Sequence, residues 1–330
     1  MLKYIILSFI LLSCKQITYE DISVQISNKN IENLESNLEK GNIDYTTQES
    51  EDLLSQAITS DFDEAVELLL KKGINPNIKI NNIELAEYLL SQKNGKYLIL
   101  LLENGYNSNL KINDTESLLF WVILNDHYEL IEPLIHYGAD INFIKPITKI
   151  PVFDLAIRLV PESYQKYFIT ERLDTTVINH KGITYFEESI IMGSYETAKL
   201  LINTNNVIEE VNGKYFWVNV IRYWKEGSVD FAESIITKGY NLDTSLPLYQ
   251  EAIKDLNIEA VKWLISKNIS PYNEYKEEPM WYGYNAFDEI DFTRKKLRSI
   301  EIPNNYSEDK IILDEIEDIL YKNQEITSKQ

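Results

Sequence analysis

Apolar residues recur along the chain in short blocks with helical spacing, and turn residues separate the blocks. Three blocks align closely: AVELLLKKGINPN from Ala65, YLILLLENGYNSN from Tyr97 and LIEPLIHYGADIN from Leu130. Gly73, Gly105 and Gly138 close these blocks at spacings of 32 and 33 positions. Glycine can adopt the left-handed conformation that ends a helix, so each block predicts a helix followed by a tight turn.

Weaker copies extend the period to about eight repeats. Their turn positions are Gly41, Arg172, Asn205, Gly239 and Asn268. A second, shorter apolar helix is predicted upstream of the turn in several copies, at residues 53–58, 118–123, 152–157, 185–191 and 246–253. One such helix pair cannot bury its apolar face alone, so the pairs must stack on their neighbours to form a continuous core.

This order and period resemble the ankyrin repeat over about residues 20–270. The closing pattern is best kept from Leu134 to Asn142, whereas the opening Thr-Pro-Leu-His pattern survives only as a Pro-Leu pair at Pro247. The tetratricopeptide repeat has a similar period of about 34 residues but lacks the Gly-Ala-Asp-x-Asn ending. The resemblance implies an all-α solenoid of about eight divergent helix-turn-helix repeats that binds another protein and has no intrinsic catalytic site.

The pattern also suggests boundaries. We expect a polar tether over 14–30, the repeat array over 31–306, and a capping helix with a loose tail over 307–330. Residues 208–228 interrupt the register and predict an extra turn. The segment from Pro271 to Asn285 lengthens the loop before the last helices.

The amino-terminal residues have the pattern of an export signal. Lys3 precedes an apolar run that ends at Leu12, which is about half the length a helix needs to cross a bilayer. Residues 11–14, Leu-Leu-Ser-Cys, resemble a bacterial lipobox, and Cys14 is the only cysteine. The resemblance implies removal of residues 1–13, lipidation of Cys14, and attachment to the cell membrane or outer membrane, facing the periplasm or the surface. The alternative is an ordinary secretory signal with an incidental cysteine.

Composition argues against several kinds of chemistry. The net charge of −20 gives a field of the wrong sign for nucleic acid and favours a basic partner. The sequence has no HExxH pair, no GxSxG elbow and no glycine-rich phosphate loop. We therefore expect no enzyme, cofactor, metal or small-molecule substrate. Adjacent acids such as Glu187 and Glu188 are interpreted as a solvated surface.

Three groups of residues are candidates for partner binding. The inner-helix positions expected to face a partner include Tyr88, Trp121, Leu124 and Arg158, with Gln56, Thr59, Leu155, Glu188 and Ile191 in equivalent places. Trp121 is the preferred anchor, although it could instead pack between neighbouring inner helices. A second cluster lies in the long loop: Tyr272, Tyr275, Trp281, Tyr282 and Tyr284. It could bind a partner or cover the last repeat. For a third group, Tyr215, Trp217, Tyr223 and Trp224, core packing is favoured.

The sequence thus predicts a membrane-tethered protein-interaction module. Two alternatives remain open. One is a periplasmic immunity or inhibitor protein that neutralises a basic toxin, and the other is a structural lipoprotein of the cell envelope.

Overall fold

The computed structural model describes residues 16–92, 95–112, 115–170, 172–203, 216–275, 283–299 and 306–327. The chain divides into two compact units, Met1–Ile147 and Thr148–Gln330. The predicted signal peptide, Cys14, Asn205, Tyr215, Trp281 and Tyr282 lie outside the described residues.

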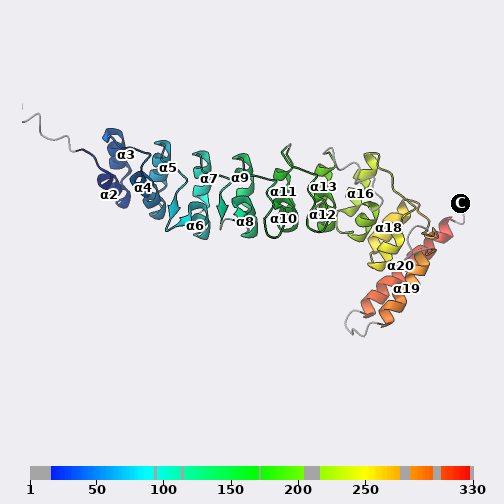
Figure 1. Ribbon diagram of the computed structural model, residues 1–330. Helices are drawn as coiled ribbons and strands as arrows, with labels where there is room; N and C mark the ends of the chain where they lie inside the picture. The colour runs from blue at the N-terminus through cyan, green and yellow to red at the C-terminus, as the bar shows by residue number, and fades with distance from the viewer. Residues whose placement is uncertain are drawn as a thin grey trace, which may run out of the picture. The chain divides into compact units, whose positions relative to one another are not determined.

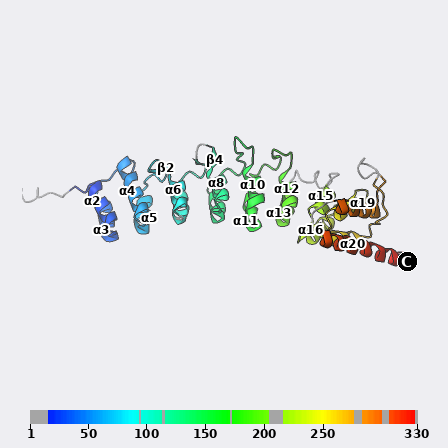
Figure 2. The same cartoon turned by 90° about the horizontal axis from the view of Figure 1, so that it is seen from below.

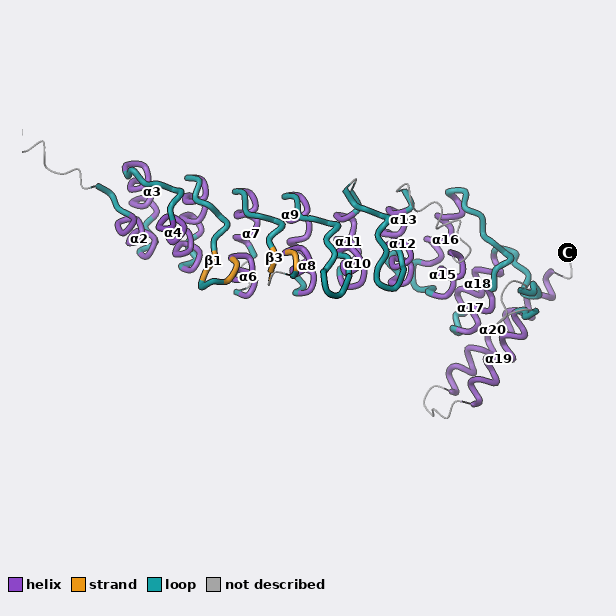
Figure 3. The backbone as a smooth tube through the Cα atoms, viewed as in Figure 1, coloured by secondary structure: helices purple, strands orange, loops and turns teal. Residues whose placement is uncertain are grey.

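The described part of the first unit is built from helix pairs that stand side by side (Figures 1 and 2). The pairs are α2 (Tyr19–Ser27) with α3 (Ile31–Lys40), α4 (Gln48–Thr59) with α5 (Asp63–Lys71), α6 (Leu85–Ser91) with α7 (Lys96–Glu103), and α8 (Leu118–Leu124) with η1 (Tyr128–Leu130) and α9 (Ile131–His136). A short antiparallel hairpin, built from two strands of two residues each, precedes α6, and another precedes α8 (Figure 3). They are β1 (Lys79–Ile80) with β2 (Ile83–Glu84), and β3 (Lys111–Ile112) with β4 (Glu116–Ser117).

The second unit continues the same alternation of inner and outer helices. Its pairs are α10 (Val152–Leu159) with α11 (Glu162–Gln165) and η2 (Lys166–Phe168), α12 (Tyr185–Met192) with α13 (Tyr195–Leu201), α15 (Phe216–Arg222) with α16 (Ser228–Thr237), α17 (Leu248–Lys254) with α18 (Ile258–Ser266), and finally α19 (Ala286–Ser299) with α20 (Tyr306–Thr327). The predicted all-α solenoid of ankyrin type is confirmed, with eight helix pairs before the last one in the described part of the chain.

The turn residues adopt the backbone conformation that their chemistry predicts. Gly73, Gly105, Gly138 and Gly239 have φ between 90° and 95°, and Asn268 has a φ of 57°. Gly41 is an exception, because it ends α3 in an extended conformation with a φ of −75°. The left-handed glycines let the chain leave each outer helix sharply and enter the next loop.

Asparagine side chains join successive loops in the first unit. Asn77 donates to the carbonyl of Gly105 (3.2 Å) and accepts from the backbone N–H of Asn107 (2.7 Å). One repeat later, Asn109 donates to the carbonyl of Gly138 (2.9 Å) and accepts from the N–H of Asp140 (2.7 Å). These bonds connect neighbouring repeats although the Thr and His of the ankyrin opening pattern are absent.

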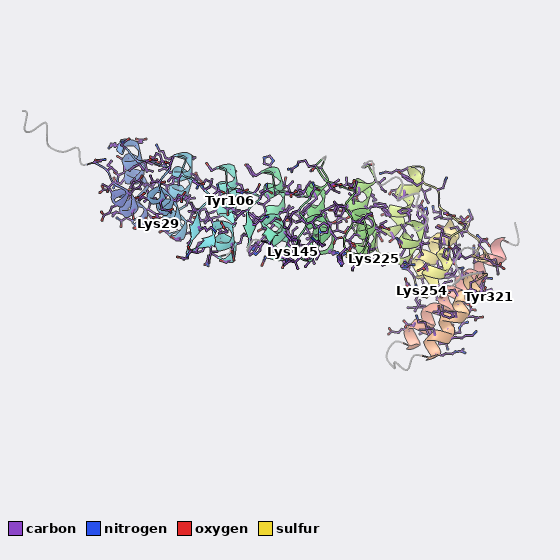
Figure 4. All side chains as sticks on the ribbon, viewed as in Figure 1. Lys29, Tyr106, Lys145, Lys225, Lys254 and Tyr321 are labelled. Atoms are coloured by element: carbon purple, nitrogen blue, oxygen red, sulfur yellow. The ribbon has the colours of Figure 1, made fainter. Side chains whose placement is uncertain are left out.

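Polar side chains make further links between adjacent repeats within each unit, and Figure 4 labels several of the residues. Lys29 donates to the carbonyl of Asp61 (2.9 Å), and Lys145 pairs with Glu116. In the second unit, Lys225 donates to the carbonyl of Ile191 (2.9 Å). Within each unit, these directed bonds add to the packing between the repeats that they join.

Two predicted boundaries and one predicted turn are wrong. Residues 19–27 form helix α2 and not a tether, because Ile22 and Ile26 are fully buried and Thr18 and Asp21 form a capping box. The final helix extends to Thr327, so the tail is not loose from Lys322 onward. The apolar residues after position 215 are not an extra turn, because they form α15, the inner helix of a regular repeat.

Candidate interaction surface

The inner helices of the first unit present a strip of uncharged side chains. Each helix contributes one residue and a second residue one turn later. The pairs are Val24 and Ser27 on α2, Gln56 and Thr59 on α4, Tyr88 and Ser91 on α6, and Trp121 and Leu124 on α8. We call these eight residues the neutral strip. Val24 and Leu124 are exposed, whereas Tyr88 and Trp121 are half-buried.

Local packing explains why Trp121 and Leu124 face outward from α8. Ser117 caps the helix by accepting the backbone N–H of Phe120 (3.1 Å). The remaining faces of this short helix bury Leu118, Leu119, Phe120, Val122 and Ile123. The core fixes the rotation of the helix, so the two positions left over are the ones that can meet a partner.

The Trp121 ring stacks on the imidazole of His127, in the turn of its own repeat. The ring centroids are 6.2 Å apart and the planes differ by 13°. His127 in turn lies 3.5 Å from a carboxylate oxygen of Glu129. The ring that supports Trp121 therefore comes from its own repeat. The alternative prediction is a Trp121 ring packed between neighbouring inner helices. The binding role of Trp121 stays a prediction.

Polar members of the neutral strip bond to one another across repeats. The side-chain amide of Gln56 donates to the hydroxyl of Ser27 (2.7 Å) and to the carbonyl of Ser23 (3.0 Å). Gln56 and Ser27 are therefore held in place before any partner binds.

Two of the equivalent positions in the second unit, Arg158 on α10 and Glu188 on α12, are charged, whereas Leu155 and Ile191 are apolar. Arg158 on α10 contacts Asp154 (Nε to Oδ2, 3.1 Å) and Glu188 of α12 (Nη2 to Oε2, 2.8 Å). Both carboxylates are only 1% exposed. Asn179 adds a second donor to Asp154, at 2.9 Å. Arg158 thus lies between two buried acids, and its predicted role in partner binding is untested.

One arginine cannot neutralise both of these acids. Burial raises the pKa of Glu188, and the nearby Arg158 opposes that rise. The second oxygen of Glu188, Oε1, and the hydroxyl of Tyr185 are buried without a hydrogen-bond partner among the described residues. The expectation of a solvated surface is wrong for Glu188, while its neighbour Glu187 closes a capping box with Thr184.

A second buried ion pair repeats the arrangement further along the unit. Arg222 on α15 makes two bonds of 2.9 Å to Glu251 on α17, which is fully buried. Lys254 lies 3.6 Å from the same carboxylate. The bonds to Glu251 raise the pKa of Arg222. Sequence reasoning missed these acids because it treated charge as a mark of exposure. The spacing from Arg158 to Glu188 and from Arg222 to Glu251, about one repeat, is the signal that could have found them.

The predicted tyrosine cluster is only partly brought together. Tyr275 is buried, and its backbone pairs with Gly283 (2.8 Å) and Tyr284 (3.2 Å), so its side chain is not part of an exposed surface. Tyr284 and Tyr272 are 38% and 45% exposed. Tyr272 packs on Phe287 of α19, and Phe287 packs on Tyr321 of α20. Phe287 and Tyr321 are not among the residues predicted from the sequence to bind a partner.

Core packing is confirmed for the two tryptophans of the third group. Trp217 and Trp224 are 2% and 8% exposed, and both rings contact Trp263. The indole N–H of Trp217 donates to the carbonyl of Asn241 (2.8 Å). These two tryptophans belong to the core of the second unit and are not a candidate surface.

Other features of the described residues offer little chemistry. A shallow depression of about 360 Å³ lies at the turns of the second unit, lined by Trp224, Lys225, Glu226, Gly227, Val229, Asn257 and Glu259. The described ranges hold no group of three or more His, Cys, Asp or Glu side chains that could bind a metal ion. No helix in the described part of the chain is long and apolar enough to span a membrane.

Comparisons with known proteins give structural neighbours only. No protein-family model matches the chain, and no curated protein matches it. An ankyrin repeat domain from Acinetobacter baumannii AYE is 20% identical, with a TM-score of 0.39, over 55% of this chain and 95% of that one. The ankyrin repeat domain of Bcl-3, a member of the IkappaB protein family, is 14% identical, with a TM-score of 0.44, over 63% of this chain and 97% of that one. The fold assignment rests on the helix pairs, turns and asparagine bonds described above.

Proposed function

We propose that the chain is a non-catalytic protein-binding module that is tethered to a membrane. The observation that carries the binding role is the neutral strip. One residue in four of the whole chain is charged, yet none of the eight strip residues is. The cores of protein interfaces are depleted in charged residues and enriched in aromatic ones, which matches the presence of Tyr88 and Trp121.

Two members of the strip are held by contacts with other residues, which favours binding through the strip. Trp121 is held by its stack on His127, and Gln56 by its bonds to the preceding repeat. Side chains that are ordered before binding lose less conformational entropy when a partner docks. Aromatic residues are also the commonest interface anchors. Trp121 is therefore the side chain whose loss should weaken binding most.

The membrane tether rests on the sequence around Cys14. Helix α2 begins at Tyr19, so few residues separate it from the lipidated cysteine. At about 3.5 Å for each extended residue, the first repeat would lie within roughly 20 Å of the lipid surface. An exported chain anchored in this way would hold its neutral strip close to the cell membrane or outer membrane.

Variant chains test the two parts of the proposal separately. Intact cells that express the full chain are treated with a crosslinker, and the proteins captured by wild type, Trp121→Ala and Tyr137→Ala are compared. Tyr137 is also an exposed aromatic residue of the first unit but lies outside the strip. We expect Trp121→Ala alone to lose a captured protein; equal capture by all three chains would refute the binding surface.

The tether is tested with Cys14→Ser. The wild-type chain should incorporate labelled palmitate and partition into detergent, and the variant should do neither. Continued detergent partitioning by the variant would exclude lipidation at Cys14. The identity of the captured protein also decides between the alternatives. A basic toxin would indicate an inhibitor, and an envelope component would indicate a structural lipoprotein.

A further inference from the structure

Three aromatic rings from separate segments pack against one another at the C-terminal end of the second unit, with interplanar angles of 31° and 37°. Tyr272 follows α18, Phe287 lies on α19 and Tyr321 on α20. The ring centroids are 5.1 Å apart between Tyr272 and Phe287, and 4.9 Å apart between Phe287 and Tyr321. We call these three residues the aromatic ladder. Figure 4 labels Tyr321 on its helix.

The aromatic ladder is unusual for the end of a repeat array. Terminal repeats normally present a polar outer face, since no further repeat covers them. Here Tyr272 is 45% exposed and Tyr321 is 50% exposed. Exposed aromatic patches on a soluble fold commonly mark contact sites. The three rings are held together by direct contacts between one loop and two helices.

Acidic side chains surround the ladder on α20. Asp314, Glu317 and Asp318 precede Tyr321 by seven, four and three positions, which places them on the same helix face. Arg294 of α19 contacts Asp314 (3.2 Å) and Glu317 (2.6 Å).

The single arginine does not balance these acids. Arg294 also contacts Asp291, at 3.4 Å, so one base is shared among three carboxylates. Asp318 is exposed and makes no ion pair among the described residues. Lys322, which follows Tyr321 directly and lies four positions after Asp318, is a second base beside the ladder. With four acids and two bases, the surface beside Tyr321 has a local excess of negative charge.

We propose that the aromatic ladder is a docking surface for a cationic segment of a partner protein. Arginine or lysine side chains of that segment stack on Tyr272 and Tyr321, and apolar side chains pack against Phe287. Cations are attracted to the faces of aromatic rings, and the neighbouring carboxylates strengthen the attraction. A second copy of this chain is a poor occupant, because the acidic patch and the net charge of −20 repel another copy. This proposal is independent of the neutral strip.

The test measures binding of a short synthetic peptide of alternating arginine and leucine residues to the full chain. A peptide of alternating glutamate and leucine serves as the control ligand. We expect Tyr321→Ser and Tyr272→Ser each to weaken binding of the arginine peptide about two- to fivefold. Tyr137→Ser removes an exposed tyrosine of the first unit and should not change the affinity.

A pair of charge variants separates local recognition from the field of the whole protein. Asp318→Asn and Asp230→Asn remove the same charge from exposed helix positions, but only Asp318 lies beside the ladder. We expect a weaker affinity for Asp318→Asn alone. Equal affinities for these two variants, or no loss in both tyrosine variants, would refute the proposal. Trp121→Ala should leave peptide binding unchanged, so failure here is distinguishable from failure of the proposed function.

Discussion

Breaking the buried ion pair between Arg158 and Glu188 should cause a large loss of stability. Replacing Arg158 with leucine puts an apolar side chain at the position and leaves Asp154 and Glu188, each 1% exposed, without their shared cation. The expected result is destabilisation of the second unit, because a buried charge without a partner is far more costly than an exposed one.

The magnitude follows from the geometry. At 2.8 Å and an effective dielectric constant of about 20, the attraction between Arg158 and Glu188 is about 6 kcal/mol. Desolvation of Arg158 offsets part of this, and breaking buried pairs typically costs about 3–5 kcal/mol. We expect Arg158→Leu to lower the free energy of unfolding by that amount.

Urea unfolding of the full chain is the assay, with tryptophan fluorescence as the reporter, because Trp217, Trp224 and Trp263 belong to the second unit. Lys262→Leu is the matched control, since Lys262 pairs with Glu259 at 2.9 Å but both side chains are exposed. The control should be almost neutral. A cost below about 1 kcal/mol for Arg158→Leu would refute the interpretation that these acids depend on the arginine.

Three further predictions concern pH, turn geometry and the first repeat. The raised pKa of Glu188 means that the folded state binds its proton more tightly than the unfolded state. Its contribution to stability is therefore complete below the unfolded pKa of about 4.3 and is lost as pH rises through the raised value. Glu188→Gln should become more stable relative to wild type as pH rises. The free energies of unfolding of the two chains, measured in urea at several pH values, would change in parallel if this is wrong. Gly105→Ala should cost about 1 kcal/mol or more because Gly105 has a φ of 91°, whereas Gly95→Ala, in a helical conformation with its nearest neighbours at 3.7 Å, should cost much less. A lower melting temperature for Gly95→Ala than for Gly105→Ala would contradict this prediction. Ile22→Ala should cost about 2–5 kcal/mol if α2 is a packed helix, against a small effect for the exposed Val24→Ala. Equal unfolding midpoints for the two variants would instead support a tether.

Much of the repeat architecture was predictable because it depends on local backbone chemistry. Gly73, Gly105, Gly138 and Gly239 mark turns that require a left-handed residue, and Asn268 fills the same role. The apolar spacing of the inner helices needed no knowledge of distant contacts. These features survive even where the ankyrin opening pattern has been lost.

The errors arise where tertiary contacts decide the outcome. Residues 19–27 are polar overall, and only the pairing of Ile22 with Ile26 and the cap at Thr18 indicate a helix. Glu188 and Glu251 are buried because arginines one repeat earlier reach them. Phe287 and Tyr321 meet Tyr272 only because α19 and α20 pack together. No local pattern contains these pairings.

Position-specific photocrosslinking in cells tests the central claim, that the neutral strip binds another protein, most directly. A photoreactive amino acid is placed at Leu124, within the strip, or at Glu103, an exposed position on the outer helix of the preceding repeat. The account predicts a defined crosslinked protein from position 124 and none from position 103. The same protein captured equally from both positions, or from position 103 alone, would contradict it.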